Sequence, residues 1–314
     1  MSAPDESKLS QMAKGAGAGA GVASSPLSPG LWLVPTPIGN VRDITLRALD
    51  VLAGADVLAC EDTRRTRQLL DLHGIAVNGR RLVSYHDRNG TGRRPQIMGW
   101  LAEGLSVAYA TDAGTPLIAD PGYRLVTEAR AAGYAVHALP GASSVLTALC
   151  TAGLPTDRFM FVGFLPVKSA QRQRVLAELS GVHATLVFFE SPRRVTETLA
   201  DMVAVLGPDR EATMARELTK KFEEVRAAPL AELAASMDQD HPPKGEIVVV
   251  VGPPDGSVVP DPADLDALLV EALAEMPTKA AARTVADQLG LARRDVYQRA
   301  IALREENPEE PDDN

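Results

Sequence analysis

The sequence lacks the features that would point to a membrane protein, a secreted protein or a metalloprotein. No apolar run in its 314 residues approaches the roughly 20 residues that a membrane-spanning helix needs. The first thirty residues lack the basic region and the apolar core of a secretory signal. The five histidines show no spacing typical of metal ligands. We therefore expect a cytoplasmic protein that uses no membrane and no metal.

Cysteine is also scarce. Only Cys60 and Cys150 are present, and each follows apolar residues, in Val-Leu-Ala-Cys and Thr-Ala-Leu-Cys. This context predicts two buried free thiols and argues against a disulfide or a metal site.

Acidic residues exceed basic ones, but they are unevenly distributed. The formal net charge of −9 by itself argues against a polyanionic partner. Six acids crowd the last ten residues, and removing their six negative charges from −9 leaves a body of about −3. Paired arginines would form a basic face if they met in the fold, although a solvated surface is the default interpretation. The pairs are Arg64-Arg65, Arg80-Arg81, Arg93-Arg94, Arg193-Arg194 and Arg293-Arg294.

The length and the hydrophobic content of 45% are enough for two domains with separate cores. Residues 1–30 are rich in Ala, Gly, Ser and Pro and contain few large side chains, which predicts a disordered leader. Residues 305–314 are expected to form an acidic tail.

Residues 31–154 are predicted to form an α/β domain with a largely parallel sheet. Short apolar runs alternate with helix-length segments, which is typical of βαβ units. Asp43 is expected to cap the first helix, and Gly54 to end it. The expected strands are 31–34, 57–60, 82–85, 107–110 and 136–139.

A second α/β domain is expected over residues 155–253, after the break at Gly153-Leu-Pro-Thr-Asp157. Helices are expected mainly at 168–180 and 192–206. Because parallel strands are usually connected by helices, so few helices favour a mixed sheet with some antiparallel pairs. The run Ile-Val-Val-Val-Val predicts a fully buried strand. The expected strands are 159–164, 184–189, 213–216, 223–226 and 246–251.

A Pro- and Gly-rich linker, 254–262, separates a small helical unit at 263–304. Residues 281–300 have the pattern of a helix-turn-helix with basic residues at the start of its second helix. A packing or dimerising three-helix cap explains the same pattern.

The strongest candidate for a binding site is the segment Asp112-Ala-Gly-Thr-Pro-Leu-Ile-Ala-Asp-Pro-Gly122. Its glycines and prolines impose a rigid path directly after a predicted strand, and its small residues let the backbone approach a ligand closely. Pro35-Thr-Pro-Ile-Gly-Asn40 and Leu139-Pro-Gly-Ala-Ser-Ser-Val145 follow two other strands, where open α/β sheets place ligands. The serines of the latter segment would equally serve as helix caps.

Glu61-Asp-Thr-Arg64 follows a further strand and would bring two carboxylates and a guanidinium to the same edge of the sheet. The alternative is an ordinary helix start, with Asp62 or Thr63 as the cap and Arg64 in solvent.

These segments together resemble the tetrapyrrole methylase-like class of S-adenosylmethionine-dependent enzymes, and within it the small-subunit ribosomal RNA methyltransferases. The resemblance covers about residues 31–304. It depends on several motifs in the same order, namely Val34-Pro-Thr-Pro-Ile-Gly-Asn40, Cys60-Glu-Asp-Thr-Arg64, Ser84-Tyr-His86, the loop at 112–122, Leu139-Pro-Gly-Ala142, Phe189-Glu-Ser-Pro-Arg193 and Arg216-Glu-Leu-Thr-Lys220.

The resemblance implies a two-domain tetrapyrrole methylase-like fold with a parallel first sheet, a mixed second sheet and a small C-terminal helical unit. It also implies a homodimer that methylates the 2′-hydroxyl of a cytidine ribose in 16S rRNA. Because the target RNA must be partly unstacked to present one ribose, we expect the substrate to be the rRNA within the small ribosomal subunit. Carried over by position, the residues expected to line the S-adenosylmethionine site are Pro35, Gly39, Asp112, Gly114, Thr115, Pro116, Ala142 and Ser143.

A ribose hydroxyl is a poor nucleophile, so a positioned base or a nearby cation should assist the reaction. The candidate catalytic residues are Glu61, Asp62, Glu217 and Lys220, with Asp62 as proton acceptor and Lys220 as the cation. The arginines expected to contact RNA are Arg64, Arg193, Arg216, Arg293 and Arg294.

Two other functions fit parts of the sequence. An enzyme of the same fold that methylates a tetrapyrrole precursor would share the donor loops, but the motifs at 61–64 and 216–220 and the basic helical unit argue against it. A nucleic-acid-binding regulator that senses a small ligand would use the helix-turn-helix, but the acidic net charge and the complete set of donor loops disfavour it.

Overall fold

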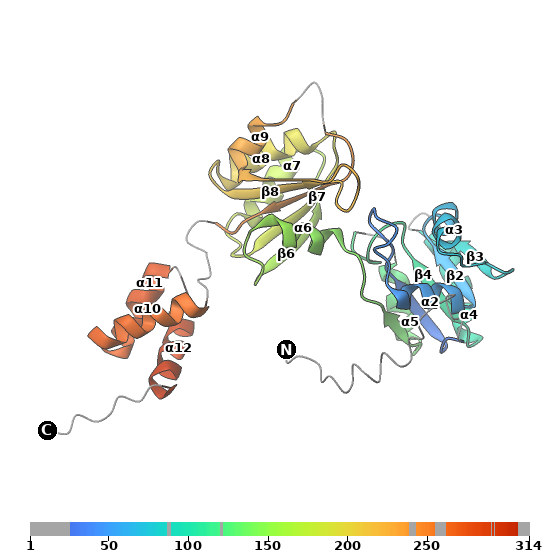
Figure 1. Ribbon diagram of the computed structural model, residues 1–314, viewed down its shortest axis with the longest axis horizontal. Coiled ribbons are helices and arrows are strands. Elements are labelled where there is room, and N and C mark those ends of the chain that lie inside the picture. The colour runs from blue at the N-terminus through green and yellow to red at the C-terminus, as the bar shows by residue number, and fades with distance from the viewer. Residues whose placement is uncertain are drawn as a thin grey trace. The chain divides into compact units, whose positions relative to one another are not determined.

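The computed structural model describes residues 26–86, 89–119, 122–238, 243–254, 262–289, 291 and 293–306. The chain forms two compact units, Met1–Ser143 and Ser144–Asn314, whose elements are labelled in Figure 1. The boundary between them therefore precedes the break at residues 153–157 on which the sequence prediction relied. Most of the predicted leader and of the acidic tail lies outside the described residues, and Gly30 already belongs to the first strand.

The first unit contains a five-stranded sheet with the order β3-β2-β4-β1-β5. Every neighbouring pair is parallel, which confirms the prediction of a parallel sheet. All five positions of β1 and of β4 are buried, as expected for strands covered on both faces. The strands are β1 (Gly30–Val34), β2 (Val57–Cys60), β3 (Arg81–Ser84), β4 (Ser106–Ala110) and β5 (Val136–Ala138).

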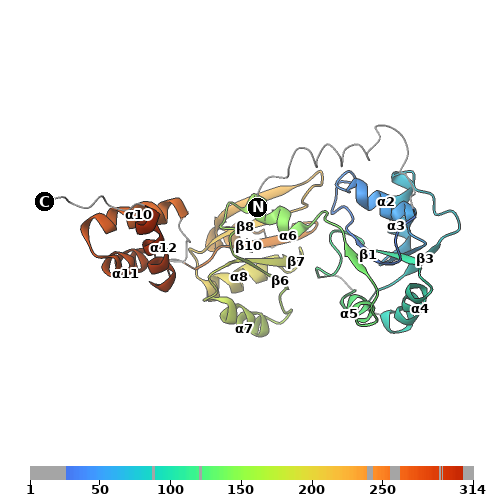
Figure 2. The same cartoon turned by 90° about the horizontal axis from the view of Figure 1, so that it is seen from below.

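Two pairs of helices cover the two faces of this sheet (Figure 2). Helices α2 (Leu46–Gly54) and α3 (Thr63–Leu72) pack on the face that includes Trp32 and Val34. Helices α4 (Gly90–Ala102) and α5 (Tyr123–Ala131) pack on the opposite face, which includes Leu31 and Leu33. Successive residues of β1 thus enter different cores, and the loops after the strands meet at the carboxyl edge of the sheet.

The expected cap of the first helix is wrong by two residues. Thr45, not Asp43, is the N-cap of α2, and its side-chain oxygen accepts the backbone N–H of Ala48 at 3.1 Å. Thr and Asp both cap helices well, so composition alone did not distinguish them. The helix ends at Gly54 as predicted.

The second unit contains a mixed five-stranded sheet with the order β6-β7-β10-β8-β9, as predicted. Strands β6 and β7 are parallel and the other neighbours are antiparallel. The predicted buried strand is the central one, β10, and all its positions are buried. The strands are β6 (Phe159–Phe164), β7 (Thr185–Glu190), β8 (Glu211–Arg216), β9 (Glu224–Pro229) and β10 (Ile247–Val251).

Helices α7 (Ser169–Leu179) and α8 (Val195–Leu206) correspond to the two helices expected in this region. With α9 (Leu230–Ala235), a short helix that the sequence did not reveal, they lie on one face of the sheet, and α6 (Ser144–Ala152) lies on the other (Figure 1). Cys150 of α6 is exposed, so the prediction of two buried thiols holds for Cys60 only.

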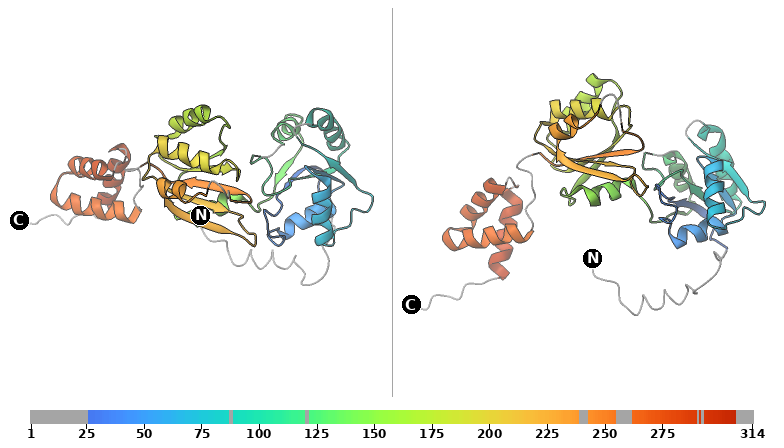
Figure 3. Two further views of the ribbon diagram at one scale, coloured as in Figure 1. Left: turned by 90° about the horizontal axis from the view of Figure 1, so that it is seen from above. Right: turned by 45° about the horizontal axis from the view of Figure 1, so that its top comes forward.

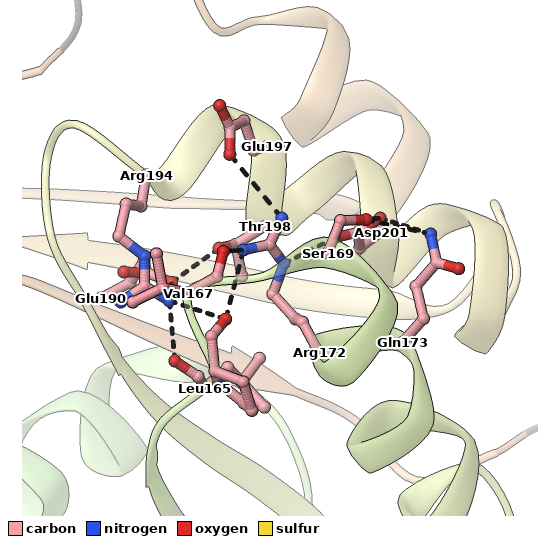
Figure 4. A network of polar contacts seen from close by, with 11 residues as sticks. Leu165, Val167, Ser169, Arg172, Gln173, Glu190, Arg194, Glu197, Thr198 and Asp201 are labelled. Carbon is pink, nitrogen blue, oxygen red and sulfur yellow. Dashed lines mark hydrogen bonds and ion pairs between the residues drawn. The ribbon is translucent and has the colours of Figure 1, made fainter.

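A polar network ties the loop after β6 to α7 and α8 (Figure 4). Arg172, whose side chain is only 1% exposed, donates to Asp201 at 2.6 Å. The Asp201 carboxylate also accepts hydrogen bonds from Ser169 at 2.9 Å and Gln173 at 2.6 Å. Since a buried charge is tolerated only when it is paired, these contacts hold the two helices in one register.

The last described helices are α10 (Pro262–Glu275), α11 (Thr278–Leu289) and α12 (Arg293–Glu306), drawn in orange to red in Figure 3. They share an apolar core that includes Leu269, Val285, Val296 and Ala300. Helix α12 extends past residue 304 into the predicted acidic tail, and Pro262, expected to end the linker, begins α10. Among the described residues, no helix is both long and apolar enough to cross a bilayer.

Candidate active site

The loops that follow β1 and β4 are joined at the carboxyl edge of the first sheet. The backbone N–H of Thr36 donates to the carbonyl of Gly114 at 3.0 Å, and the N–H of Gly114 donates back to Thr36 at 2.9 Å. The hydroxyls of Thr36 and Thr111 are buried and donate to the carbonyls of Thr111 and Gly114, at 3.0 and 2.9 Å. The start of the predicted donor loop is therefore rigid.

The loop after β5 joins the same assembly. Thr115 Oγ1 donates to the carbonyl of Ala142 at 2.9 Å, so two of the predicted donor-site residues are in direct contact. A Cβ on Gly141 would lie 2.4 Å from Cβ of Pro35, and a Cβ on Gly114 would lie 3.3 Å from Cγ2 of Ile38. Gly114 also has a φ of +81°, which favours glycine. The closeness of these backbones depends on the absence of side chains at both glycines.

A cavity of about 260 Å³ lies beside these loops on the α3 side. Of the predicted donor-site residues, Gly39 and Asp112 line it directly. Four more of them lie in the loops beside the cavity, namely Pro35, Gly114, Thr115 and Ala142. Pro116 is buried in the loop at 112–122. Ser143 is the last residue of the first unit. The residues that line the cavity are Thr36, Pro37, Gly39, Val41, Arg65, Thr66, Gln68, Leu69, Leu72, Thr111 and Asp112.

Two neighbouring carboxylates at this edge have opposite electrostatic surroundings. Burial raises the pKa of the Glu61 carboxyl, and the negative charge of Asp112 raises it further. In contrast, the hydrogen bonds from the side chain and backbone of Arg64 lower the pKa of Asp62 to about 2. Asp62 is the N-cap of α3, as the alternative interpretation of this motif proposed. Glu61 is therefore the better proton acceptor of the two.

The sequence prediction named Arg64 as an RNA contact and missed its neighbour Arg65, which is the arginine that lines the cavity. The side chain of Arg64 is 89% exposed and pairs with Asp62 at 2.9 Å. Arg65 is 3.4 Å from Asp112, the acid at the start of the donor loop. Thr36 and Thr111 were also missed. The signal that could have identified both threonines is their position at the carboxyl ends of two strands. Which of the two adjacent arginines faces the cavity depends on where α3 begins, because each residue of a helix points in a different direction.

The second unit brings Glu217 and Lys220 together. Lys220 Nζ donates to Glu217 at 2.8 Å and to Glu246 at 2.9 Å. Burial alone would lower the pKa of the Lys220 ammonium, but these carboxylates outweigh burial and raise the pKa. The hydrogen bond from Lys220 lowers the pKa of Glu217. Lys220 is thus held as a cation and Glu217 as its counter-ion, which leaves neither suited to accept a proton.

The remaining predicted RNA-contact arginines differ in availability. Arg193 and Arg294 are exposed. Arg216 is engaged with Glu224 through two hydrogen bonds, at 3.0 and 2.8 Å, and Arg293 pairs with Asp287 at 2.9 Å. Arg193 and Arg294 are consequently the better placed of the four for an anionic partner.

Comparison with known proteins assigns this arrangement to a family. Residues 30–234 match the family profile described as Tetrapyrrole (Corrin/Porphyrin) Methylases, which covers more than half of the chain. The chain belongs to the tetrapyrrole (corrin/porphyrin) methylase family. It is therefore a methyltransferase, as predicted. Residues 259–304 match a second profile, described as the RsmI C-terminal HTH domain.

Relatives of this methylase are similar along nearly their whole length. The ribosomal RNA small subunit methyltransferase I of Mesorhizobium japonicum is 50% identical over 288 residues, which span 92% of this chain and 97% of that protein. The protein of the same name from Vibrio cholerae is 47% identical over 262 residues, 83% of this chain and 90% of that protein. The solved structure of the methyltransferase CobJ, 20% identical, aligns with a TM-score of 0.55 over 72% of this chain and 95% of CobJ, and it shows the same fold.

Proposed function

We propose that this methylase transfers a methyl group from S-adenosylmethionine to the 2′-hydroxyl of a cytidine ribose in 16S rRNA. The observation that carries the proposal is the near full-length similarity to proteins named ribosomal RNA small subunit methyltransferase I. The match of residues 259–304 to a helix-turn-helix profile supports a nucleic-acid acceptor. An enzyme with this substrate works where ribosomal subunits are assembled, so we propose a cytoplasmic location.

The cavity in the first unit fits a small, polar donor. The donor would lie against Thr36, Gly39 and Asp112, where closely packed loops offer backbone polar groups and one carboxylate. Gly141, where a Cβ would lie 2.4 Å from Pro35, and Gly114, where a Cβ would lie 3.3 Å from Ile38, let these loops pack closely. S-adenosylmethionine, when bound, supplies an electrophilic methyl group. The protein's contribution is to align the acceptor oxygen and to exclude water.

We propose Glu61 as the group that accepts the proton of the ribose hydroxyl, ahead of Asp62. The raised pKa of Glu61 is closer to neutral pH, which makes this carboxylate the stronger base. A well-positioned base contributes about 10²- to 10⁴-fold to a rate. Asp62 keeps a structural role as the cap of α3. Lys220 is proposed to stabilise negative charge on the substrate, and Glu217 to position Lys220.

RNA contacts are proposed mainly for the exposed arginines Arg193 and Arg294. Smaller contributions are proposed for Arg64, Arg216 and Arg293, which already have acidic partners. A ribose can be presented only where the RNA is locally unpaired, so the substrate is proposed to be an assembled small subunit. We also propose that the enzyme acts as a homodimer.

A direct acceptor assay distinguishes this proposal from methylation of a tetrapyrrole. Purified protein is incubated with methyl-labelled donor and either 30S subunits or tetrapyrrole precursors. We expect label in RNA and none in the macrocycle. Label only in the macrocycle would establish the rival function, and label in neither would reject both.

A further inference from the structure

The connection between β8 and β9, residues 217–223, is a rigid turn of unusual backbone conformation. The backbone N–H of Lys220 donates to Glu217 at 3.0 Å, and that of Glu223 donates to Lys220 at 3.1 Å. Glu217 and Thr219 have φ angles of +51° and +64°, although neither is glycine. Such strain persists only where surrounding contacts enforce it, and it concentrates at functional sites.

The turn buries one of its apolar side chains and exposes the other. Leu218 is 6% exposed and anchors the turn, whereas Phe222 is 65% exposed. The ammonium of Lys221 lies 5.5 Å from the centre of the Phe222 ring. A phenylalanine that is 65% exposed forgoes much of the free energy of burying its ring, so a turn of defined conformation that presents one suggests a binding role.

The charges around Phe222 favour an anionic partner. The carboxylates of Glu217 and Glu246 are engaged with Lys220, and that of Glu224 with Arg216 and Arg226. The Glu223 carboxylate accepts the backbone N–H of Thr219. Within the part of the chain that the structure describes, Lys221 has no carboxylate partner. The exposed surface of the turn is therefore an aromatic ring beside an available cation.

We propose that Phe222 stacks on an unpaired base of the RNA acceptor while Lys221 contacts an adjacent phosphate. Single-stranded nucleic acids are bound in this manner, because every base has a flat face and every linkage a negative charge. A protein partner would call for a continuous apolar patch, whereas Phe222 is flanked by charged residues on both sides. The inference rests on the proposed function and specifies how its substrate is held.

The test compares methyl transfer to 30S subunits by the full chain and by Phe222→Ala, Phe222→Trp and Lys221→Glu. Phe159→Ala is the matched control, since Phe159 is another exposed aromatic of the same unit. Donor affinity and thermal unfolding are measured for every variant. We expect Phe222→Ala to lower kcat/KM by about 10-fold, the scale of one lost stacking contact, with donor affinity unchanged.

Rescue by Phe222→Trp and a steeper loss for Lys221→Glu at low salt would support nucleotide stacking. Activity of Phe222→Ala within about 2-fold of wild type, an equal loss in Phe159→Ala, or an equal loss in Phe222→Trp would overturn it. Unchanged RNA kinetics with a lost protein partner would make the turn a protein-docking site. Failure of the wild-type chain to methylate 30S subunits would instead reject the proposed function.

Discussion

At the scale of single residues, adjacent positions in the sequence have opposite properties in the fold. Glu61 lies in a partly buried site beside Asp112. Asp62, the next residue, caps α3, and Arg64 stabilises its ionised form. Arg64 faces solvent and Arg65 faces the cavity. The motif predicted that these groups would gather at one edge of the sheet. Which member of each pair faces the ligand depends on where the helix begins.

Glu61→Gln should lower kcat by about 10²- to 10⁴-fold, because the amide cannot accept a proton. Donor affinity should stay within a few-fold of wild type. Wild-type activity should fall as the pH drops through the raised pKa of Glu61, since the protonated acid is inactive, and the variant should lack this decline. Rate against pH for both proteins checks the prediction.

Asp62→Asn is the matched control for that experiment. Asparagine also caps helices, so the variant should keep the fold and lose far less activity than Glu61→Gln. If Asp62→Asn were the more damaging substitution, Asp62 would be the base and Glu61 a supporting residue.

At the scale of elements, two groups of contacts hold neighbouring segments together. One joins the loops after β1, β4 and β5, which pack closely at glycines, and the other is the polar network of the second unit. The first forms the edge of the cavity and the second fixes α7 against α8. The alternation of strands and helices was predictable from apolar periodicity. The identity of the α2 cap was not, because Thr45 and Asp43 are both good N-cap residues. The short helix α9 and the unit boundary at Ser143 were not predictable either, because they depend on tertiary contacts that leave little trace in local sequence.

Gly114→Val should abolish donor binding. Its φ of +81° disfavours valine, and the new Cβ would press on Ile38 at 3.3 Å and displace the loop. Gly104→Val is a matched control, because Gly104 has a similar φ of +77° with nothing within 4 Å of a Cβ. Calorimetric titration with donor should separate the two variants. Equal donor affinity in both would mean that the loop does not shape the site.

Asp201→Ala should lower the free energy of unfolding by about 3 kcal/mol, because it leaves the buried Arg172 charge without its main partner. Glu197→Ala is the control. Glu197 is 74% exposed and 3.8 Å from Arg172, so its loss should cost under about 1 kcal/mol. Urea unfolding at pH 7 measures both, and similar values would show that the network is not a stabilising element.

The same pair predicts a pH dependence of stability. Burial alone would raise the pKa of Asp201, but hydrogen bonds from Gln173, Ser169 and Arg172 outweigh it and lower the pKa. A lowered folded-state pKa contributes stability above the unfolded value, near 4, that is lost as the pH falls through the folded value. Wild type and Asp201→Ala should therefore converge in acid, and a constant difference down to about pH 2 would contradict this assignment.

At the scale of the whole molecule, the methylase units and the C-terminal helices have separate cores. A chain ending at residue 254 should therefore fold and bind donor normally. Its KM for 30S subunits should rise about 10- to 100-fold through lost phosphate contacts. An unchanged KM would favour the packing or dimerising cap that the sequence also allowed. Full-length Arg294→Gln, which keeps the helices, tests the charge alone.

The acceptor that we propose for the whole enzyme is a cytidine ribose of small-subunit RNA. Its most direct test is nucleoside analysis by mass spectrometry of RNA from 30S subunits after incubation with the purified chain and labelled donor. We expect one labelled product, 2′-O-methylcytidine, and at least about 100-fold slower labelling when Glu61→Gln replaces the wild type under the same conditions. A label on a base, on another nucleoside or on no RNA would contradict it.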